Sequence, residues 1–256
     1  MKQSFLPIKR IIKEPYSKIL GYPKATKRQL EARVLELKKL GVSHISFQGK
    51  TRIGVLSVLG KGYVGVVVLA KKRNRVCALK IRRLDSQRGG MNNEAILLRL
   101  ANKSEVGPIL FDNSKNFLVM EFLDGEKIGD WINSLSGKGS VRKMKLVIRK
   151  VLEDCYNLDQ SGFDHGELSS IVKHVIVGEK TTIIDFESSS TDRRVANVTS
   201  ATQGIFIGSG ISKKVQRIYR IPPKDQIIEA LRNYKKEQTR NSFDRLLKIL
   251  KLENAR

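Results

Sequence analysis

The chain has 256 residues, 40% hydrophobic and 29% charged, a composition that supports a sizeable core in one or two domains. Its 49 Lys and Arg residues outnumber 25 Asp and Glu residues, for a formal net charge of +24. Such a field attracts polyanions, above all nucleic acid, although a solvated lysine-rich surface without a dedicated partner is the alternative. Cys77 and Cys155 form no C-x-x-C motif, so we expect no cysteine metal or redox site. No apolar run is long enough to span a membrane, and the N-terminus has no signal-type segment, so we expect a cytoplasmic protein.

The first fifty residues predict a basic N-terminal extension with a helical module. They carry 12 Lys and Arg against 3 Asp and Glu. Apolar residues recur near a 3.6-residue period over residues 26–40, with Thr26 suited to the N-cap and Gly41 to the C′ position. Residues 42–53 read as a strand pair that turns at residues 48–50. Binding of phosphate backbones and simple support of the following segment both stay open for this extension.

A glycine-rich stretch follows, with Gly60, Gly62 and Gly65 in the spacing G-x-G-x-x-G. A dinucleotide-binding turn with this spacing opens a helix, whereas here the glycines lead into a β-branched run. Residues 65–69 and 76–81 predict two strands joined by a basic turn at residues 71–75. This hairpin is the protein-kinase arrangement of a phosphate-covering loop, and an ordinary hairpin is the alternative.

The second strand of this hairpin carries a candidate nucleotide contact. Ala78 and Lys80 are two residues apart and share one face, with Val67 opposite on the neighbouring strand. Val67 and Ala78 could cover the adenine ring of a nucleotide, with the ammonium of Lys80 near its phosphates. Residues 91–101 predict a helix whose Glu94 would pair with Lys80; a first-turn glutamate favoured by the helix dipole is the other interpretation.

Residues 109–111 and 116–123 predict two further strands. The second ends at Asp124-Gly125, before a helix expected from Lys127, which is typical of a hinge between two lobes. Backbone groups of Glu121 and Leu123 would then bond the adenine edge, with Met120 at the back of the pocket. A core strand followed by a turn describes the same residues.

Residues 140–161 predict the longest helix, and its apolar stripe indicates core. The chain continues through Phe163-Asp164-His165-Gly166-Glu167-Leu168 into a hairpin of residues 175–177 and 181–185, which ends at Asp185-Phe186. The stripe consists of Val141, Met144, Ile148, Val151, Leu152, Cys155 and Leu158.

These motifs, in this order, resemble those of the small atypical protein kinases: the RIO family, the kinases of the tRNA-modification complex and, more specifically, the related predicted archaeal serine/threonine kinases. The resemblance covers about residues 55–206. It implies an α+β, bilobal protein-kinase-like fold with a small β-rich lobe and a larger helical lobe. The expected division is a basic extension at residues 1–50, an N-lobe at 51–120 and a C-lobe at 121–256.

The resemblance also implies roles for individual residues. The three glycines would cover the phosphates of ATP, Lys80 would contact the α- and β-phosphates, and Glu94 would hold Lys80. Asp185 matches the metal-binding aspartate, since Mg²⁺ prefers oxygen ligands. Glu167 stands where the family has its catalytic aspartate, and His165 would support that loop.

Two departures from the family pattern bear on catalysis. Glu167 is longer than the expected aspartate, so it either receives the hydroxyl proton with altered geometry or only orients the substrate. The expected second metal ligand, an asparagine, falls on Val172, and a shift of two residues would align His174 instead. No A-P-E motif follows, and residues 188–192 form a compact polar turn that is open to phosphorylation but is explained equally by turn composition.

Three helices are expected in the last quarter of the chain. Thr199 is the predicted cap of a helix that runs to residue 207, Pro222-Pro223 begins another, and Ser242 is the predicted cap of the last. Residues 211–256 carry 13 Lys and Arg against 5 Asp and Glu. Both ends of the chain are therefore basic.

The sequence thus predicts an ATP- and Mg²⁺-dependent phosphotransferase, an atypical serine/threonine protein kinase that also phosphorylates itself and is linked to RNA or ribonucleoprotein. The alternative is a kinase-fold ATPase or a catalytically weak ATP-binding scaffold on a ribonucleoprotein. A small-molecule phosphotransferase is a third interpretation, which needs an acidic substrate pocket that so basic a chain disfavours.

Overall fold

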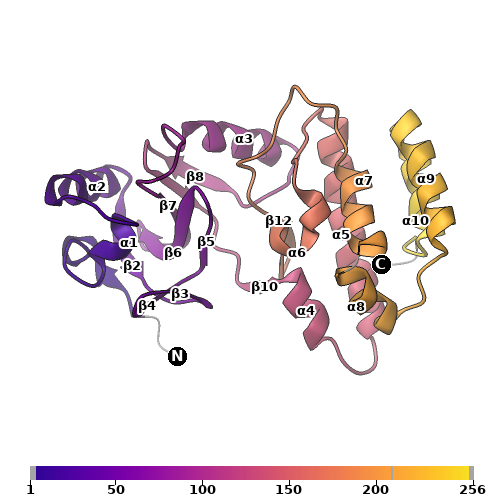
Figure 1. Ribbon diagram of the computed structural model, residues 1–256, viewed down its shortest axis with the longest axis horizontal. Helices are drawn as coiled ribbons and strands as arrows, with labels where there is room; N and C mark the ends of the chain where they lie inside the picture. Colours follow the sequence, from indigo (N-terminus) through magenta and orange to yellow (C-terminus); the bar gives the residue numbers. More distant parts are fainter. Residues whose placement is uncertain (1–3, 209, 254–256) are drawn as a thin grey trace. The chain divides into compact units, whose positions relative to one another are not determined.

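The structure is a computed structural model that describes residues 4–208 and 210–253. It is α+β, as expected, with a β-sheet region and a helical region (Figure 1). Contacts divide the chain into two compact units: unit 1 comprises Met1–Arg99 and Pro108–Leu123, and unit 2 comprises Leu100–Gly107 and Asp124–Arg256. Residues 1–3 and 254–256, at the ends of the expected extension and C-lobe, lie outside the described residues.

Unit 1 is built on an antiparallel sheet whose described strands run in the order β1-β2-β6-β7-β9-β8, with β5 beside β6. The elements of unit 1 are β1 (Leu6–Pro7), a 3-10 helix (Ile8–Arg10), α1 (Ser17–Leu20), α2 (Lys27–Lys39), β2 (Val42–Ser46), β3 (Thr51–Ile53), β4 (Leu56–Val58), β5 (Gly60–Lys61), β6 (Gly65–Lys72), β7 (Arg75–Arg82), most of α3 (Asn92–Lys103), β8 (Leu110–Asn113) and β9 (Phe117–Met120).

The hairpin of β6 and β7 forms the centre of this sheet, and its prediction is confirmed. Its turn is tighter than the expected five residues, since Lys72 pairs with Arg75 across a two-residue loop. Arg73 and Asn74 both have positive φ, at 46° and 65°. This left-handed pair is the turn type whose twist matches that of an antiparallel hairpin.

The N-terminal segment packs against one face of this hairpin and so supports it, while binding of phosphate backbones by the segment stays a prediction. Thr26 caps α2 in a reciprocal capping box with Gln29, and Gly41 follows α2 with φ of 69° as a C′ residue. The shared core joins side chains of the segment to alternate residues of β6, β7 and β9: Ile11, Ile19, Leu20, Leu37, Ile45, Val66, Val68, Ala70, Cys77, Leu79, Ile81, Phe117 and Val119.

The predicted strand pair within residues 42–53 is wrong. β2 pairs with β1 and β6, while β3 pairs with β4 through a turn at Gly54 and Val55. Gly54 has φ of 59°, which favours glycine and permits the tight turn. The apolar side chains of β2 are better buried against β6 than across a local hairpin, and Ile45 is 1% exposed there.

Unit 2 combines helices with a three-stranded antiparallel sheet of order β10-β11-β12. Its elements are β10 (Gly125–Lys127), α4 (Ile128–Ser134), α5 (Ser140–Gln160), a 3-10 turn (Leu168–Ser170), α6 (Ile171–His174), β11 (Val175–Gly178), β12 (Thr181–Ile183), α7 (Asn197–Thr202), a π-helical turn (Gln203–Ile207), α8 (Ile211–Ile218), α9 (Lys224–Glu237) and α10 (Arg240–Ile249).

Helix α5 confirms the predicted apolar stripe except at its first member. Six of the seven predicted core residues are buried, but Val141 is 40% exposed because it lies in the first turn of the helix. The predicted hairpin of β11 and β12 is also confirmed, and β10 adds a third strand that was not predicted.

Two predicted helix caps are corrected. Thr199 lies inside α7 and bonds the Ala196 carbonyl, three residues back. Ser242 is the third residue of α10 and forms a reciprocal capping box with the true cap, Thr239. Pro223 precedes α9, as predicted.

Among the described residues, no helix has both the length and the apolar character that crossing a membrane requires. Cys77 and Cys155 are buried and free, and burial raises the pKa of the Cys77 thiol to about 11. Both cysteines therefore serve as core residues.

Candidate functional site

In unit 1, the sheet face opposite the N-terminal segment carries the predicted nucleotide contacts. Val67 pairs with Lys80, and Ala78 pairs with Met120 on β9. Directly paired residues, and residues two apart on a strand, point to the same face. The register therefore brings Gly65, Val67, Ala78, Lys80 and Met120 to one face.

The predicted ion pair between Lys80 and Glu94 forms on this face. The Nζ atom of Lys80 lies 2.6 Å from Oε1 of Glu94, and the two side chains are 8% and 7% exposed. Glu94 lies in the first turn of α3, as expected. Removing one partner of such a buried pair leaves an uncompensated charge and typically costs about 3–5 kcal/mol.

The third glycine of the motif makes room for the Lys80 side chain. A Cβ atom on Gly65 would lie 2.9 Å from Cγ of Lys80 and 3.0 Å from the carbonyl oxygen of Ile81. The amide of Gly62 donates to the Gly65 carbonyl at 2.8 Å and closes the tip of the β5–β6 hairpin. A Cβ atom on Gly60, by contrast, would meet no atom within 4 Å, so packing does not require a glycine there.

The predicted hinge residues follow β9, which ends at Met120 rather than at Leu123. The amide of Glu121 donates to the Ile109 carbonyl at 2.8 Å, and the Glu121 carboxylate accepts from the Ile109 amide at 3.2 Å. The Glu121 amide is thus already used within the protein, so the predicted backbone contact of Glu121 with an adenine edge cannot come from this amide while it bonds Ile109. The backbone contact of Leu123 stays a prediction. The helix expected from Lys127 begins one residue later, at Ile128, after the short strand β10.

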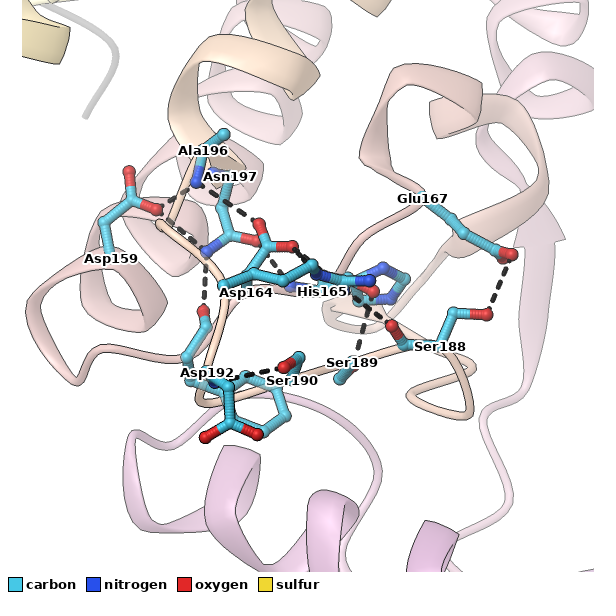
Figure 2. A network of polar contacts seen from close by, with 12 residues as sticks. Asp159, Asp164, His165, Glu167, Ser188, Ser189, Ser190, Asp192, Ala196 and Asn197 are labelled. Carbon is cyan, nitrogen blue, oxygen red and sulfur yellow. Dashed lines mark hydrogen bonds and ion pairs between the residues drawn. The ribbon is translucent and has the colours of Figure 1, made fainter.

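In unit 2, a polar network holds the loop that contains His165 and Glu167 (Figure 2). Backbone groups of Asp164 and Ser190 exchange two hydrogen bonds, at 2.8 and 2.9 Å. The side-chain oxygen of Asn197 accepts from the His165 amide at 2.8 Å, and the Asn197 side-chain nitrogen donates to Asp159. Asp159 is further bonded by the hydroxyl of Tyr234, so the loop is tied to α5, α7 and α9.

His165 is fully buried and faces inward from this loop. Its Nε2 lies 3.1 Å from the Ile184 carbonyl oxygen, which only accepts, so Nε2 carries the proton. Burial lowers the pKa of His165 from 6.5 to about 4. A neutral, buried imidazole fits the predicted supporting role and does not fit direct proton exchange with a substrate.

The Glu167 carboxylate has a partner on each oxygen. Oε1 accepts from the Ser188 hydroxyl at 3.0 Å, and Oε2 lies 3.2 Å from Nε2 of His174. Burial lowers the pKa of His174 while Asp185 and Glu167 oppose that shift, so the ring is neutral and donates to the carboxylate. His174, which the two-residue shift aligned with the missing asparagine, thus bonds Glu167. Val172 points elsewhere, toward Gly129 of α4.

Asp185 comes two residues after the end of β12, with φ of 73°. Its carboxylate oxygen lies within 4.8 Å of one from Glu187. Two carboxylates at this separation are hard oxygen donors, the chemistry that Mg²⁺ prefers, so these residues fit the predicted metal. The Asp185 charge also acts on Lys127. Burial lowers the pKa of Lys127, and the negative charge of Asp185 partly opposes that shift.

The predicted residues fall into two groups. The glycines, Val67, Ala78, Lys80, Glu94 and Met120 lie together in unit 1, whereas His165, Glu167 and Asp185 lie together in unit 2. Sequence reasoning missed Asn197, Arg193 and Ser188, which hold the Glu167 loop. Among these three residues, only Ser188 had a signal in the sequence, the serine-rich composition of residues 188–190.

Comparison with known proteins found no matching protein-family model and no similar curated protein.

Proposed function

We propose that this chain is an ATP- and Mg²⁺-dependent phosphotransferase of the bilobal protein-kinase type, which transfers phosphate to serine or threonine hydroxyls, its own included. In this proposal, unit 1 with its N-terminal support is the small lobe and unit 2 is the larger lobe. The observation that carries the proposal is the buried Lys80–Glu94 ion pair beneath a glycine hairpin. Burying a lysine in this way costs free energy, and an apolar side chain would pack there equally well. The charge therefore points to a function.

The unit 1 face supplies what a nucleoside triphosphate needs. Val67, Ala78 and Met120 offer an apolar surface to a flat base. Lys80 is the cation beside them, and Glu94 fixes its ammonium so that it neutralises phosphate charge without reorganising. Gly60, which packing does not require to be glycine, leaves its backbone open to close approach by a phosphate.

Asp185, with Glu187 beside it, would hold Mg²⁺ in unit 2. When bound, the metal supplies charge neutralisation at the transferring phosphoryl group. Glu167 would receive the proton of the attacking hydroxyl, and His174 would hold the carboxylate in place through Oε2. His165 would support the loop through its hydrogen bond to the Ile184 carbonyl.

The test is transfer of label from [γ-³²P]ATP, with Mg²⁺, to the chain and to a general acceptor such as casein. The wild-type chain is expected to label both. Asp185→Asn and Lys80→Met should each lose transfer by at least about a hundredfold while circular dichroism shows a folded chain. Transfer that survives Asp185→Asn contradicts the metal role, and a chain that does not bind ATP at all contradicts the whole proposal.

A second candidate is a kinase-fold ATPase or a weakly catalytic ATP-binding scaffold that acts on a ribonucleoprotein. The engagement of both Glu167 oxygens favours it, since a substrate hydroxyl must displace a partner. The charge of +24 adds a reason to expect RNA. This candidate predicts ATP binding or hydrolysis without labelled protein, so the same assay separates the two.

A further inference from the structure

The hydroxyl of Ser188 occupies the place that an acceptor hydroxyl would take against Glu167. Its Oγ donates to Oε1 of Glu167 at 3.0 Å (Figure 2). Nε2 of His174 lies 3.2 Å from the other carboxylate oxygen, Oε2. A proton-accepting carboxylate must lie about 2.6–3.2 Å from the hydroxyl that it deprotonates. Ser188 meets this requirement within the chain itself.

The other hydroxyls of this turn do not lie on Glu167. The hydroxyl of Ser189 points to the His165 carbonyl, 3.4 Å away, and the Ser190 oxygen accepts from the amide of Asp192. Thr191 is exposed. Ser188 is thus distinguished from its neighbours by geometry, although all of them look alike in sequence.

The backbone on either side of Ser188 is held in position. Arg193 donates from Nη2 to the Ser188 carbonyl at 2.7 Å, and its Nε bonds Asp164 at 3.0 Å. A Cβ on Gly166 would lie 2.4 Å from this guanidinium, so the glycine makes the close approach possible. Ser188 is therefore presented to Glu167 by a fixed turn.

We propose that Ser188 is the phosphoryl acceptor of this chain in an intramolecular reaction. The inference rests on the proposed function. Oγ of Ser188 forms a bond to the γ-phosphorus of ATP as the bond from that phosphorus to the β–γ bridging oxygen breaks. The hydroxyl proton passes to Glu167, and ADP leaves with the bridging oxygen. The products are phosphoserine at position 188 and ADP.

The reaction limits itself to one transfer per chain. Phosphoserine carries a charge of about −2 and cannot donate to Glu167, so the two anions repel each other. The guanidinium of Arg193, which already bonds the Ser188 carbonyl, is a cation placed to receive the phosphate. The modified side chain thereby moves off Glu167 and leaves Oε1 open to the hydroxyl of another substrate.

The experiment labels the full chain with [γ-³²P]ATP and Mg²⁺ and locates the phosphate by mass spectrometry. We expect label at Ser188, approaching one phosphate per chain, at a fractional rate that does not change with protein concentration. Ser188→Ala should reduce the incorporated label at least about tenfold. Glu167→Gln should reduce the rate of labelling by about 10²–10⁴-fold. The matched control Ser189→Ala should label like the wild type.

Several results would overturn this assignment. Label on Ser189, Ser190 or Thr191 instead, or a fractional rate that rises with protein concentration, refutes Ser188 as an intramolecular acceptor. If casein is labelled but the chain is not, the inference fails together with the self-phosphorylation part of the proposed function, while phosphate transfer to other hydroxyls stands. If no ATP is bound, both fail together.

Discussion

Both charges of the Lys80–Glu94 pair are buried, so removing one charge should destabilise the protein more than removing both. Glu94→Gln leaves the ammonium without its counter-charge, and we expect a loss of about 3–5 kcal/mol in the free energy of unfolding. The double variant Lys80→Met/Glu94→Leu removes both charges and should recover most of that loss. Urea unfolding measures both.

Nucleotide binding separates stability from function in the same variants. The double variant should be folded yet bind ATP no better than Lys80→Met alone. A stable double variant with wild-type affinity would show that the pair is only structural. Equal instability of Glu94→Gln and the double variant would mean that packing, rather than charge, dominates the site.

His165 predicts a loss of stability in acid. Its pKa falls from 6.5 to about 4 on folding, so between these values the unfolded chain binds more protons than the folded one. The free energy of unfolding should therefore decrease as pH falls from 6.5 to 4, by about 3 kcal/mol in total. Urea unfolding at a series of pH values measures this slope.

His165→Gln is the matched control, since its amide can still donate to the Ile184 carbonyl but does not titrate in this range. Its acid slope should be shallower than that of the wild type. Asp154, whose buried carboxyl has its pKa raised to about 6, contributes the opposite slope in both proteins and cancels in the comparison. Identical slopes would show that His165 is not the group responsible.

At the scale of elements, the β5–β6 hairpin distinguishes between its glycines. Gly65→Ala forces a methyl group against Lys80 and the Ile81 carbonyl, and we expect it to cost about 1–3 kcal/mol and to weaken ATP binding. Gly60→Ala meets no atom within 4 Å and should leave unfolding nearly unchanged. Calorimetry of ATP binding, with urea unfolding, checks both; equal effects would contradict the packing explanation.

Elements with strong local signals could be predicted from the sequence. The cap residue Thr26, the apolar stripe of α5 and the β-branched runs of β6 and β7 each act over a few residues. The Lys80–Glu94 pair could also be anticipated, because the hairpin and the following helix set the positions of both residues.

What the sequence could not show depends on pairings between distant residues. The strand β2 pairs with β6, about 25 residues on, because burial of Ile45 outweighs a local turn. Likewise, nothing in the spacing of Glu167 and Ser188, or of His165 and Asn197, indicates contact. Thr199 failed as a cap because the helix already begins at Asn197, with Ala196 at the N-cap position.

For the whole molecule, the charge of +24 predicts salt-dependent binding to RNA. A surface that neutralises six to ten phosphates would lose about 10³–10⁵-fold in affinity between 50 and 200 mM salt. Filter binding to a single-stranded RNA over this range measures the slope. A peptide nucleic acid of the same sequence, which has no phosphates, should not bind; retention that is insensitive to salt would contradict a partner recognised by charge.

The left-handed backbone of Asp185 has a consequence for variant design. Alanine in an ordinary strand or helix is more stable than glycine, because glycine has more freedom to lose on folding. At φ of 73° this order should reverse, by about 1 kcal/mol. Asp185→Gly and Asp185→Ala remove the same carboxylate and the same contacts, so their difference in urea unfolding reports the backbone alone. If glycine is the more stable of the two variants, residue 185 keeps a side chain that its own backbone disfavours.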